Sequence, residues 1–424
     1  MGLQTRPSAP AQSDTVKGYD ERQATSTVDS RTLWIQTEQS GRYLFSDEHP
    51  FHPVRLALTE NLLKHCGALD PAAGERPASF EETEAIIEHI HRADYVKAVR
   101  SLSVESPKLA AIADAGRFGL EADGDTPYFP GMHEAAVAVA AGSIAAAEAV
   151  MSGKADRALH LAGGLHHAFP DRASGFCVYN DAAAAISVLR ERYQARVLYI
   201  DTDVHHGDGV QWFFYTDPNV FTLSIHETGK FLFPGSGFTH ERGDSSGYGA
   251  CLNLAMEPYT EDDSWLTCFS EAIERAALAF KPDIIVSQHG CDAHAFDPLA
   301  HIHCSMSIYR EMPRLLQALA ERHTGGKWVA LGGGGYDHWR VVPRAWSLLW
   351  LEMVRHPLLA SIDAAPDGGP LPAGWPDIKT TMSPDGPLPT TWLDDVASWE
   401  PMPRRAEITE KNKKMLELAL QHIG

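Results

Sequence analysis

Basic residues are scarce in this sequence, and cysteine is sparse and unpatterned. The 36 Lys and Arg residues stand against 56 Asp and Glu, which gives a formal net charge of −20. Because nucleic-acid binding requires a basic face, we expect no nucleic-acid partner. The six cysteines include no CxxC pair and follow no disulfide framework. We therefore expect reduced thiols in a cytoplasmic protein.

The sequence also lacks segments typical of membrane insertion. Its first residues, MGLQTRPSAPAQSDT, are polar and contain no apolar core of a signal peptide. The most apolar long stretch, Ala135 to Met151, is mostly alanine and contains Glu148, whereas a membrane span is longer and more hydrophobic. This stretch predicts a buried helix, and we expect no membrane partner.

Composition divides the chain into a polar arm and one large domain. Residues 1 to about 40 are rich in Ser, Thr, Gln and charge, which predicts a flexible N-terminal arm. The chain is 44% hydrophobic, enough for a large core, and we expect residues 41–424 to form a single domain. Within it, the Pro/Gly-rich segment from about Ile362 to Pro389 predicts an irregular surface crossing. A final helix is expected from about Ala406 to His422.

The middle of the chain alternates short, β-rich apolar runs with longer helical patterns. This alternation predicts an α/β protein with a doubly wound, mostly parallel sheet and helices on both faces. Its ligands would bind beyond the carboxyl ends of the strands. The predicted strands are Ala158–Leu161, Val197–Asp201, Val220–Ile225, Cys251–Leu254, Asp283–Gln288 and Trp328–Leu331. The predicted helices are His133–Met151, Asp181–Tyr193, Asp262–Phe280, Ser305–Glu321 and Val342–Arg355.

Polar and glycine-rich clusters follow four of the predicted strands. The carboxyl ends of parallel strands meet at one edge of a sheet, so we expect the clusters to converge on one rim. In chain order they read GGLHH (163–167), DTDVHHGDG (201–209), QHGCD (288–292) and GGGGY (332–336).

The second and third clusters contain candidate metal ligands. Asp201, Asp203 and His205 alternate along an extended segment, so their side chains point to the same side. Asp292, at another strand end, is the candidate for a further ligand. Asp and His ligands together with water match a catalytic zinc site with an open position, although ferrous iron accepts the same ligand types. The alternative for DxDxH alone is a solvated acidic loop with a surface histidine.

The tandem histidines of the first cluster, His166 and His167, can supply a general base and an electrostatic partner. Each ring needs a carboxylate that fixes its tautomer, and Asp201 and Asp208 are the candidates. Taken alone, a His-His pair is more often a pair of polar surface residues.

The glycine run of the fourth cluster predicts backbone that passes tightly along a ligand channel, with Gly334 as a candidate substrate-binding position. The run lacks dinucleotide-loop spacing, and no Lys-Ser/Thr follows it. Tyr336 would enter the site from this loop and donate to a developing oxyanion. The alternative for Tyr336 is a core or rim aromatic.

Six motifs in order resemble those of the zinc-dependent histone deacetylase family. The chain is similar to its class I-like members and to bacterial acetoin-utilisation deacetylases, from about Tyr43 to about Trp350. The resemblance implies an arginase-like α/β fold, with a shared core of about 43–350 and a C-terminal extension of about 360–424. It also implies hydrolysis of Nε-acetyl-lysine in a protein or peptide to lysine and acetate. The motifs are GGLHHA, SGFCVYND, DTDVHHGDGV, LSIH followed by FPGSG, QHGCDAH and LGGGGY.

The resemblance implies catalytic and metal-binding roles by motif position. His167 would be the main general base and acid beside His166, and Tyr336 would stabilise the oxyanion. The implied Zn²⁺ ligands are Asp203, His205 and Asp292. The implied structural K⁺ site is formed by Asp201, Asp203, His205, Ser224 and Ile225.

The resemblance also implies a narrow substrate tunnel. Asp125 at its rim would hold the substrate backbone, and Arg55 would line an internal acetate pocket. The implied tunnel walls are Gly175, Phe176, Phe233 and Leu299. Two residues depart from the family pattern and bear on metal preference or rim shape: Cys291, where class I members usually have Ala, and His294.

Three alternatives to protein deacetylation stay open. The same site could act on acetylpolyamines or other small acylated amines. A manganese ureohydrolase shares the related fold but needs bridging carboxylates in DxHxD form, where this chain has DxDxHH and a Tyr. A non-catalytic scaffold would not need an intact set of ligands, histidines and tyrosine. The oligomeric state also stays open.

Overall fold

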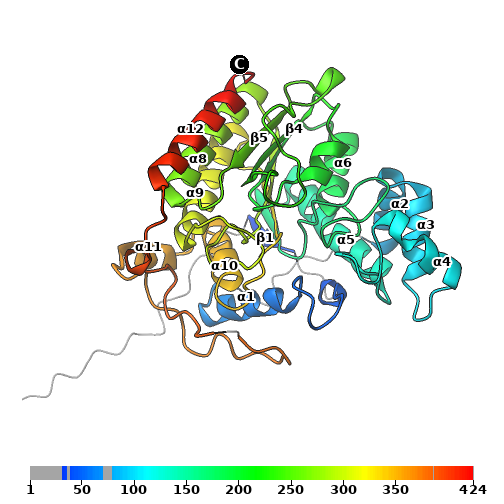
Figure 1. Cartoon of the computed structure of the whole chain (residues 1–424), viewed down its shortest axis with the longest axis horizontal. Helices are drawn as coiled ribbons and strands as arrows, with labels where there is room; N and C mark the ends of the chain where they lie inside the picture. Colours follow the sequence, from blue (N-terminus) through cyan, green and yellow to red (C-terminus); the bar gives the residue numbers. More distant parts are fainter. Residues whose placement is uncertain (1–30, 36–38, 70–78, 385, 424) are drawn as a thin grey trace, which may run out of the picture.

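One parallel sheet runs through the molecule. The computed structural model describes residues 31–35, 39–69, 79–384 and 386–423. The strands are β1 (Thr32–Trp34), β2 (Arg157–His160), β3 (Val197–Asp201), β4 (Val220–Glu227), β5 (Cys251–Met256), β6 (Ile284–Gln288) and β7 (Trp328–Leu331). In the described residues they form one sheet, ordered β1-β2-β7-β6-β3-β4-β5, and each neighbouring pair is parallel (Figure 1). The predicted α/β architecture with a parallel sheet is therefore confirmed.

Helices surround this sheet. The α-helices are α1 (Val54–His65), α2 (Phe80–Ile90), α3 (Ala93–Leu102), α4 (Leu109–Asp114), α5 (Met132–Met151), α6 (Asp181–Tyr193), α7 (Asp208–Phe213), α8 (Asp262–Phe280), α9 (Met306–His323), α10 (Val342–Met353), α11 (Leu358–Ala364) and α12 (Arg405–Leu420). Short 3-10 helices are η1 (Ser40–Arg42), η2 (Ala115–Phe118), η3 (Ser245–Gly247) and η4 (Val396–Ser398). In Figure 1, α2, α3 and α4 form an outlying group beside α5, while α8, α9 and α12 lie on the opposite side.

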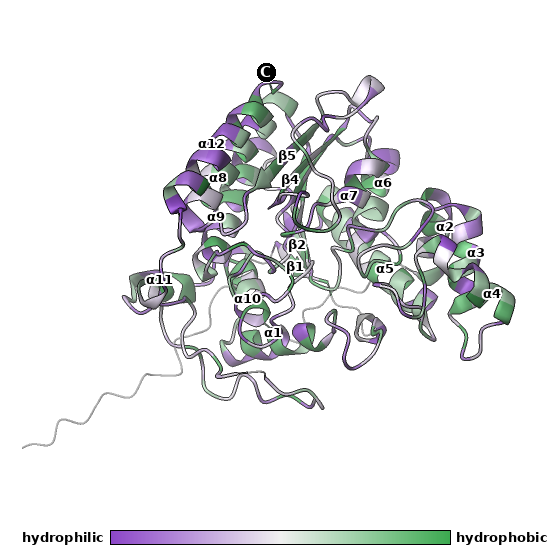
Figure 2. Ribbon diagram, in the orientation of Figure 1, coloured by the Kyte–Doolittle hydropathy of each residue, from purple (hydrophilic) through white to green (hydrophobic). Residues whose placement is uncertain are grey.

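The two faces of the sheet pack into separate cores. Along β3, Leu198 and Ile200 join the core formed with α8, α9 and α10, whereas Val197 and Tyr199 join the core formed with α5 and α6. Successive side chains of a strand point to opposite faces, so a strand covered on both sides is largely apolar. Figure 2 shows much of β4 and β5 in green, the colour of hydrophobic residues.

Helix α5 is a core element. It is long and apolar enough to cross a membrane by length and composition, yet 78% of its most apolar window is buried inside the protein. It packs against α6 and β2. At Gly142 a Cβ atom would lie 2.2 Å from Nε2 of His160, so the close approach of this helix to β2 depends on glycine. The predicted buried helix is confirmed.

The boundary predicted for the N-terminal arm is wrong. Thr32, Leu33 and Trp34 form the edge strand β1, which pairs with β2. Trp34 is buried and its ring meets Trp350 of α10 edge-on at 5.2 Å. Burying an aromatic side chain outweighs the polar composition of its neighbours. Residues 1–30 and 36–38 of the predicted arm lie outside the described residues.

A buried network fastens the C-terminal extension to the domain. The carboxylate of Asp394 contacts Nε2 of His294 at 2.9 Å and accepts hydrogen bonds from the Arg344 guanidinium at 2.9 Å and the Met306 N–H at 2.7 Å. Burial alone would raise the pKa of Asp394, but His294 and Arg344 hold it well below its usual value. The extension is therefore held by a charged carboxylate.

We expect Asp394→Asn to lower the free energy of unfolding by about 3 kcal/mol near neutral pH, because buried Arg344 loses its counter-charge. A depressed folded pKa stabilises the protein above the unfolded pKa of about 3.9, and this contribution is lost as pH falls through the folded pKa. The difference in unfolding free energy between Asp394→Asn and the wild type should therefore become smaller as the pH is lowered. Urea unfolding at neutral and acid pH measures it, with exposed Asp395→Asn as control. A gap that stays constant with pH would contradict the ion pair.

Candidate active site

The candidate site lies where two central strands end. In the sheet β3 lies between β4 and β6, and the chain continues from β3 to one side and from β6 to the other. Such a switch point leaves a crevice beyond the carboxyl ends of the strands. Asp203 and His205 follow β3, and Asp292 follows β6. The second and third of the four predicted clusters therefore meet at one rim, as expected.

Asp203, His205 and Asp292 form a compact, buried donor set. One ligand atom from each lies within 4.8 Å of the others. Nδ1 of His205 is 3.2 Å from Asp203 Oδ1 and 3.1 Å from Asp292 Oδ2. Burial alone would lower the pKa of His205, but the two carboxylates raise it to about 10. A site that draws positive charge this strongly, with one imidazole and two carboxylates, fits a divalent cation.

Neighbouring groups orient both carboxylates. Oδ2 of Asp203 accepts hydrogen bonds at 2.8 Å from the Gln288 side-chain amide and from the Gly334 N–H. Oδ1 of Asp292 accepts from the Val204 N–H at 2.8 Å. A Cβ atom at Gly334 would lie 2.2 Å from Asp292 Oδ2, so only glycine lets the backbone pass here. Such outer contacts fix ligand geometry.

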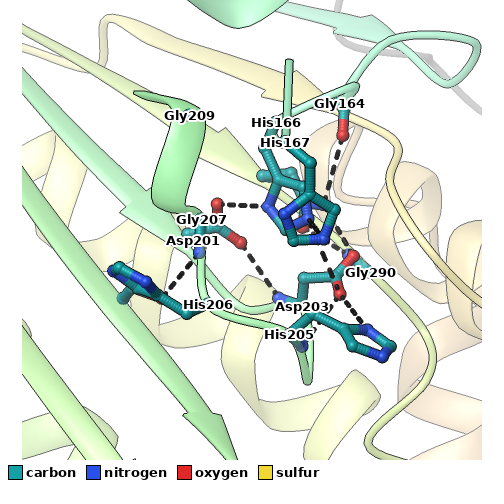
Figure 3. A network of polar contacts seen from close by, with 12 residues as sticks. Gly164, His166, His167, Asp201, Asp203, His205, His206, Gly207, Gly209 and Gly290 are labelled. Carbon is teal, nitrogen blue, oxygen red and sulfur yellow. Dashed lines mark hydrogen bonds and ion pairs between the residues drawn. The ribbon is translucent and has the colours of Figure 1, made fainter. Parts of the chain in front are cut away.

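The tandem histidines lie directly over this donor set (Figure 3). Nδ1 of His166 is 2.8 Å from Asp201, and Nδ1 of His167 is 2.7 Å from Asp208. The two Nε2 atoms are 3.0 Å apart, and that of His166 is 3.9 Å from Asp203. The structure therefore brings each histidine to one of the two candidate carboxylates, His166 to Asp201 and His167 to Asp208.

The pKa values of the two histidines are shifted in opposite directions. Burial alone would lower the pKa of His166, but Asp201 and Asp203 raise it to about 9. Burial, with the charges of His166 and His205, pushes the pKa of His167 well below its usual value. These shifts favour a cationic His166 beside a neutral His167.

Tyr336 reaches the same site from the glycine run. Its ring centroid is 6.4 Å from that of His205 and 5.8 Å from that of Phe176. Its backbone N–H donates to Asp297 at 2.8 Å. Burial and the carboxylate of Asp292 raise the pKa of Tyr336 well above its usual value, so its hydroxyl stays a donor at neutral pH.

Two phenylalanines flank the approach to the histidines. The ring of Phe233 is 42% exposed and meets that of His167 edge-on at 5.0 Å. Phe176 follows Gly175, and both have positive φ. A Cβ atom at Gly175 would lie 2.5 Å from His167, so this wall depends on glycine for close approach.

Three other predicted substrate residues, Asp125, Leu299 and Arg55, differ in their exposure. Asp125 is exposed, and the hydroxyl of the next residue, Thr126, accepts the Phe176 N–H at 2.9 Å. Leu299 is half-buried. The buried guanidinium of Arg55 donates to the carbonyls of Gly333 and Gly335 at 3.0 Å. In this structure Arg55 thus braces the glycine run that carries Tyr336.

The residues of the expected potassium site also lie together. Asp201 and Ser224 are register partners across β3 and β4, with Ile225 next along β4. Asp203 and His205 follow Asp201 directly. Main-chain and side-chain oxygens suit a hard cation, and the potassium site stays a prediction.

Sequence reasoning missed three supporting residues. Asp297 accepts the N–H groups of both Leu299 and Tyr336. Asp181 accepts those of Gly164 and Leu165 ahead of the histidines, at 3.0 and 2.7 Å. Gln288 stands inside the QHGCD motif and was passed over. Asp181 and Gln288 stand inside SGFCVYND and QHGCDAH, and this position within a motif is the signal that could have found them. Asp297 lies outside these motifs.

His294 does not shape the metal site as its position suggested. Its side chain is buried and turns to Asp394 of the C-terminal extension. Cys291 is buried too, and its backbone N–H donates to the Gly334 carbonyl at 2.8 Å. The departure at position 294 therefore serves the docking of the extension.

Comparison with known proteins agrees with this geometry. Residues 49–353 match the histone deacetylase domain. The chain is 46% identical over 392 residues to the acetoin utilization protein AcuC of Bacillus subtilis (strain 168), covering 92% of this chain and 97% of that protein. It is 43% identical to the AcuC proteins of Staphylococcus aureus (strain MRSA252), over 91% of this chain and 95% of that protein, and Staphylococcus xylosus, over 93% and 99%. By fold, site and sequence, the chain belongs to the histone deacetylase family.

Proposed function

We propose that this deacetylase acts on Nε-acetyl-lysine in proteins or peptides, with zinc as its catalytic metal. One observation carries the proposal: the buried donor set of Asp203, His205 and Asp292 lies against a histidine pair and a protonated tyrosine. An amide needs an activated water, an oxyanion donor and an acid for the leaving amine. These groups meet each need within one crevice.

A divalent cation held by the donor set would supply Lewis acidity, which polarises the acyl carbonyl and lowers the pKa of a water. Neutral His167 takes the proton of the attacking water. Tyr336 donates to the oxygen that gains negative charge. The histidine pair, its Nε2 atoms 3.0 Å apart, then returns the proton to the leaving amine, giving lysine and acetate.

The carboxylates behind the histidines keep each ring in one orientation. Asp201 also accepts a hydrogen bond from Tyr199 at 2.7 Å, which fixes the carboxylate itself. Burial raises the pKa of Asp208 to about 6. A structural potassium ion at Asp201, Asp203, His205, Ser224 and Ile225 is part of the proposal and would further fix this strand end. Buried free thiols such as Cys177 suit a reducing cytoplasm.

Small acetylated amines are the second candidate substrate. The net charge of −20 attracts polyamine cations and basic peptides alike. Purified protein reconstituted anaerobically with Zn²⁺ or Fe²⁺ should release acetate from acetyl-lysine peptides with higher kcat/KM than from acetylspermidine, and a chelator should stop it. A higher value for acetylspermidine would assign the small-amine function, and acetate from neither substrate would overturn the enzymatic proposal.

Asp297 is expected to position the tyrosine. In Asp297→Asn one of its two N–H acceptors becomes a donor, so Tyr336 should shift. We expect kcat to fall roughly 10- to 100-fold with KM and bound metal nearly unchanged, since misplacement by about 1 Å can cost this much. In a Tyr336→Phe background the same change should cost little more, as two steps of one contact are not additive. Full additivity would contradict the positioning role.

A further inference from the structure

An apolar groove lies beside the candidate active site, at the same edge of the sheet. It measures about 540 Å³. Its apolar lining comes from three segments, namely the loop after β4, the turn after β5 and the start of α12 (Figure 1). These apolar residues are Phe231, Pro258, Tyr259, Met402, Pro403 and Ile408. Ligand pockets typically measure about 300–1,000 Å³, so this groove has room for a side chain of a ligand.

The groove exposes large aromatic rings. Phe231 is 63% exposed and Tyr259 is 52% exposed. Tyr259 also holds a left-handed backbone with φ of 63°, which a bulky residue adopts only when its surroundings impose it. Exposed aromatic side chains gathered at one concave place indicate a binding surface.

Two walls of the groove are continuous with the loops that carry the predicted tunnel. Phe231 stands two residues before Phe233, whose ring meets His167. The Tyr259 N–H donates to the His301 carbonyl at 2.8 Å, and His301 stands two residues after Leu299. When the acetyl-lysine of a polypeptide lies in the site, the neighbouring residues of that polypeptide would therefore run along this groove.

The charged residues of the groove neutralise one another. Lys411 contacts Glu257 at 3.1 Å and Glu407 at 3.6 Å, and Glu407 also pairs with Arg404. The four charges form one chain of opposite signs, in a protein whose net charge is −20. Exposed ion pairs of this kind attract a further charge weakly, so the groove favours an apolar ligand.

We propose that this groove binds an apolar side chain of the acetylated polypeptide, a few residues from the acetyl-lysine. The inference rests on the proposed function and adds that the substrate is a polypeptide with an apolar residue at a set distance. A small acetylated amine reaches only the predicted tunnel. Burial of a Leu or Phe side chain accounts for about a tenfold gain in affinity at the least.

The test uses acetyl-lysine peptides in which one Leu is moved through the positions on both sides, with Asp and Lys series for comparison. Zinc-loaded full-length protein should favour Leu at one position by about tenfold in kcat/KM, and anisotropy of labelled peptides should show the same preference in binding. Ile408→Asp should abolish this preference, and Phe231→Ser should weaken it. Leu418→Asp, at a 50% exposed position on the same helix but outside the groove, should keep it.

Each outcome decides between the groove and its rivals. No preference at any position, or a preference that survives Ile408→Asp with the fold intact by circular dichroism, would overturn the proposal. A concentration-dependent dimer that Ile408→Asp dissociates would assign the groove to a second copy of the chain and also overturn it. Peptides that bind with the Leu preference but release no acetate would support the groove while defeating the proposed function.

Discussion

Replacing Asp292 with alanine is expected to remove the divalent metal and, with it, measurable deacetylation. The side chain supplies one of three clustered donor atoms, and its carboxylate lies 3.1 Å from His205. Loss of one of three protein ligands removes a third of the donor set and one negative charge from a buried site. Outer contacts alone change metal affinity 10- to 100-fold, so loss of a ligand should exceed about 100-fold.

Metal analysis of the purified variant and a competition titration with a fluorescent chelator measure this directly, without relying on activity. Asp297→Asn is the matched control, because it changes a buried carboxylate five residues away that lies outside the donor set. Full metal occupancy in Asp292→Ala would contradict the assignment of Asp292 as a ligand. Loss of metal from both variants would indicate general damage to the site.

Tyr336→Phe is expected to lose most turnover and keep its metal. The change deletes one hydroxyl whose pKa is raised by burial and by Asp292, so a neutral donor disappears while the ring remains against Phe176. Removal of one oxyanion donor costs about 2.7–4 kcal/mol in comparable sites, or about 10²–10³ in kcat. Substrate affinity should change little, because the contact strengthens only as negative charge develops.

Single-turnover rates and peptide binding, measured on the same zinc-loaded sample, separate these two effects. Tyr309→Phe is the matched control, since it removes another buried hydroxyl from α9 and leaves the oxyanion donor in place. Turnover near that of the wild type in Tyr336→Phe would remove the tyrosine from the mechanism. An equal loss in both variants would assign the effect to packing.

Most of the sheet could be predicted from the sequence. The runs at 197–200 and 328–331 are apolar at successive positions, and this pattern is typical of strands covered on both faces. The edge strand β1 escaped prediction because Thr32–Trp34 is only three residues long and lies within a largely polar part of the sequence. Its assignment depends on pairing with β2, more than a hundred residues away.

The sequence by itself determined which side chains were available for chemistry. Asp203, His205 and Asp292, the histidine pair and Tyr336 stand at strand ends, where hydrophobic periodicity stops and polar residues begin. Local spacing also carried the expectation that Asp203 and His205 point to one side. These inferences depend on neighbours in the chain, which a sequence displays directly.

Tertiary structure alone decided how those side chains are held. Asp297 reaches Tyr336 across 39 residues, Arg55 reaches the glycine run across about 280, and His294 turns to Asp394 across 100. The same is true of the groove, whose walls come from the ends of β4 and β5 and from α12. Such contacts form only when the whole sheet has assembled, because packing between segments distant in the sequence brings their partners together.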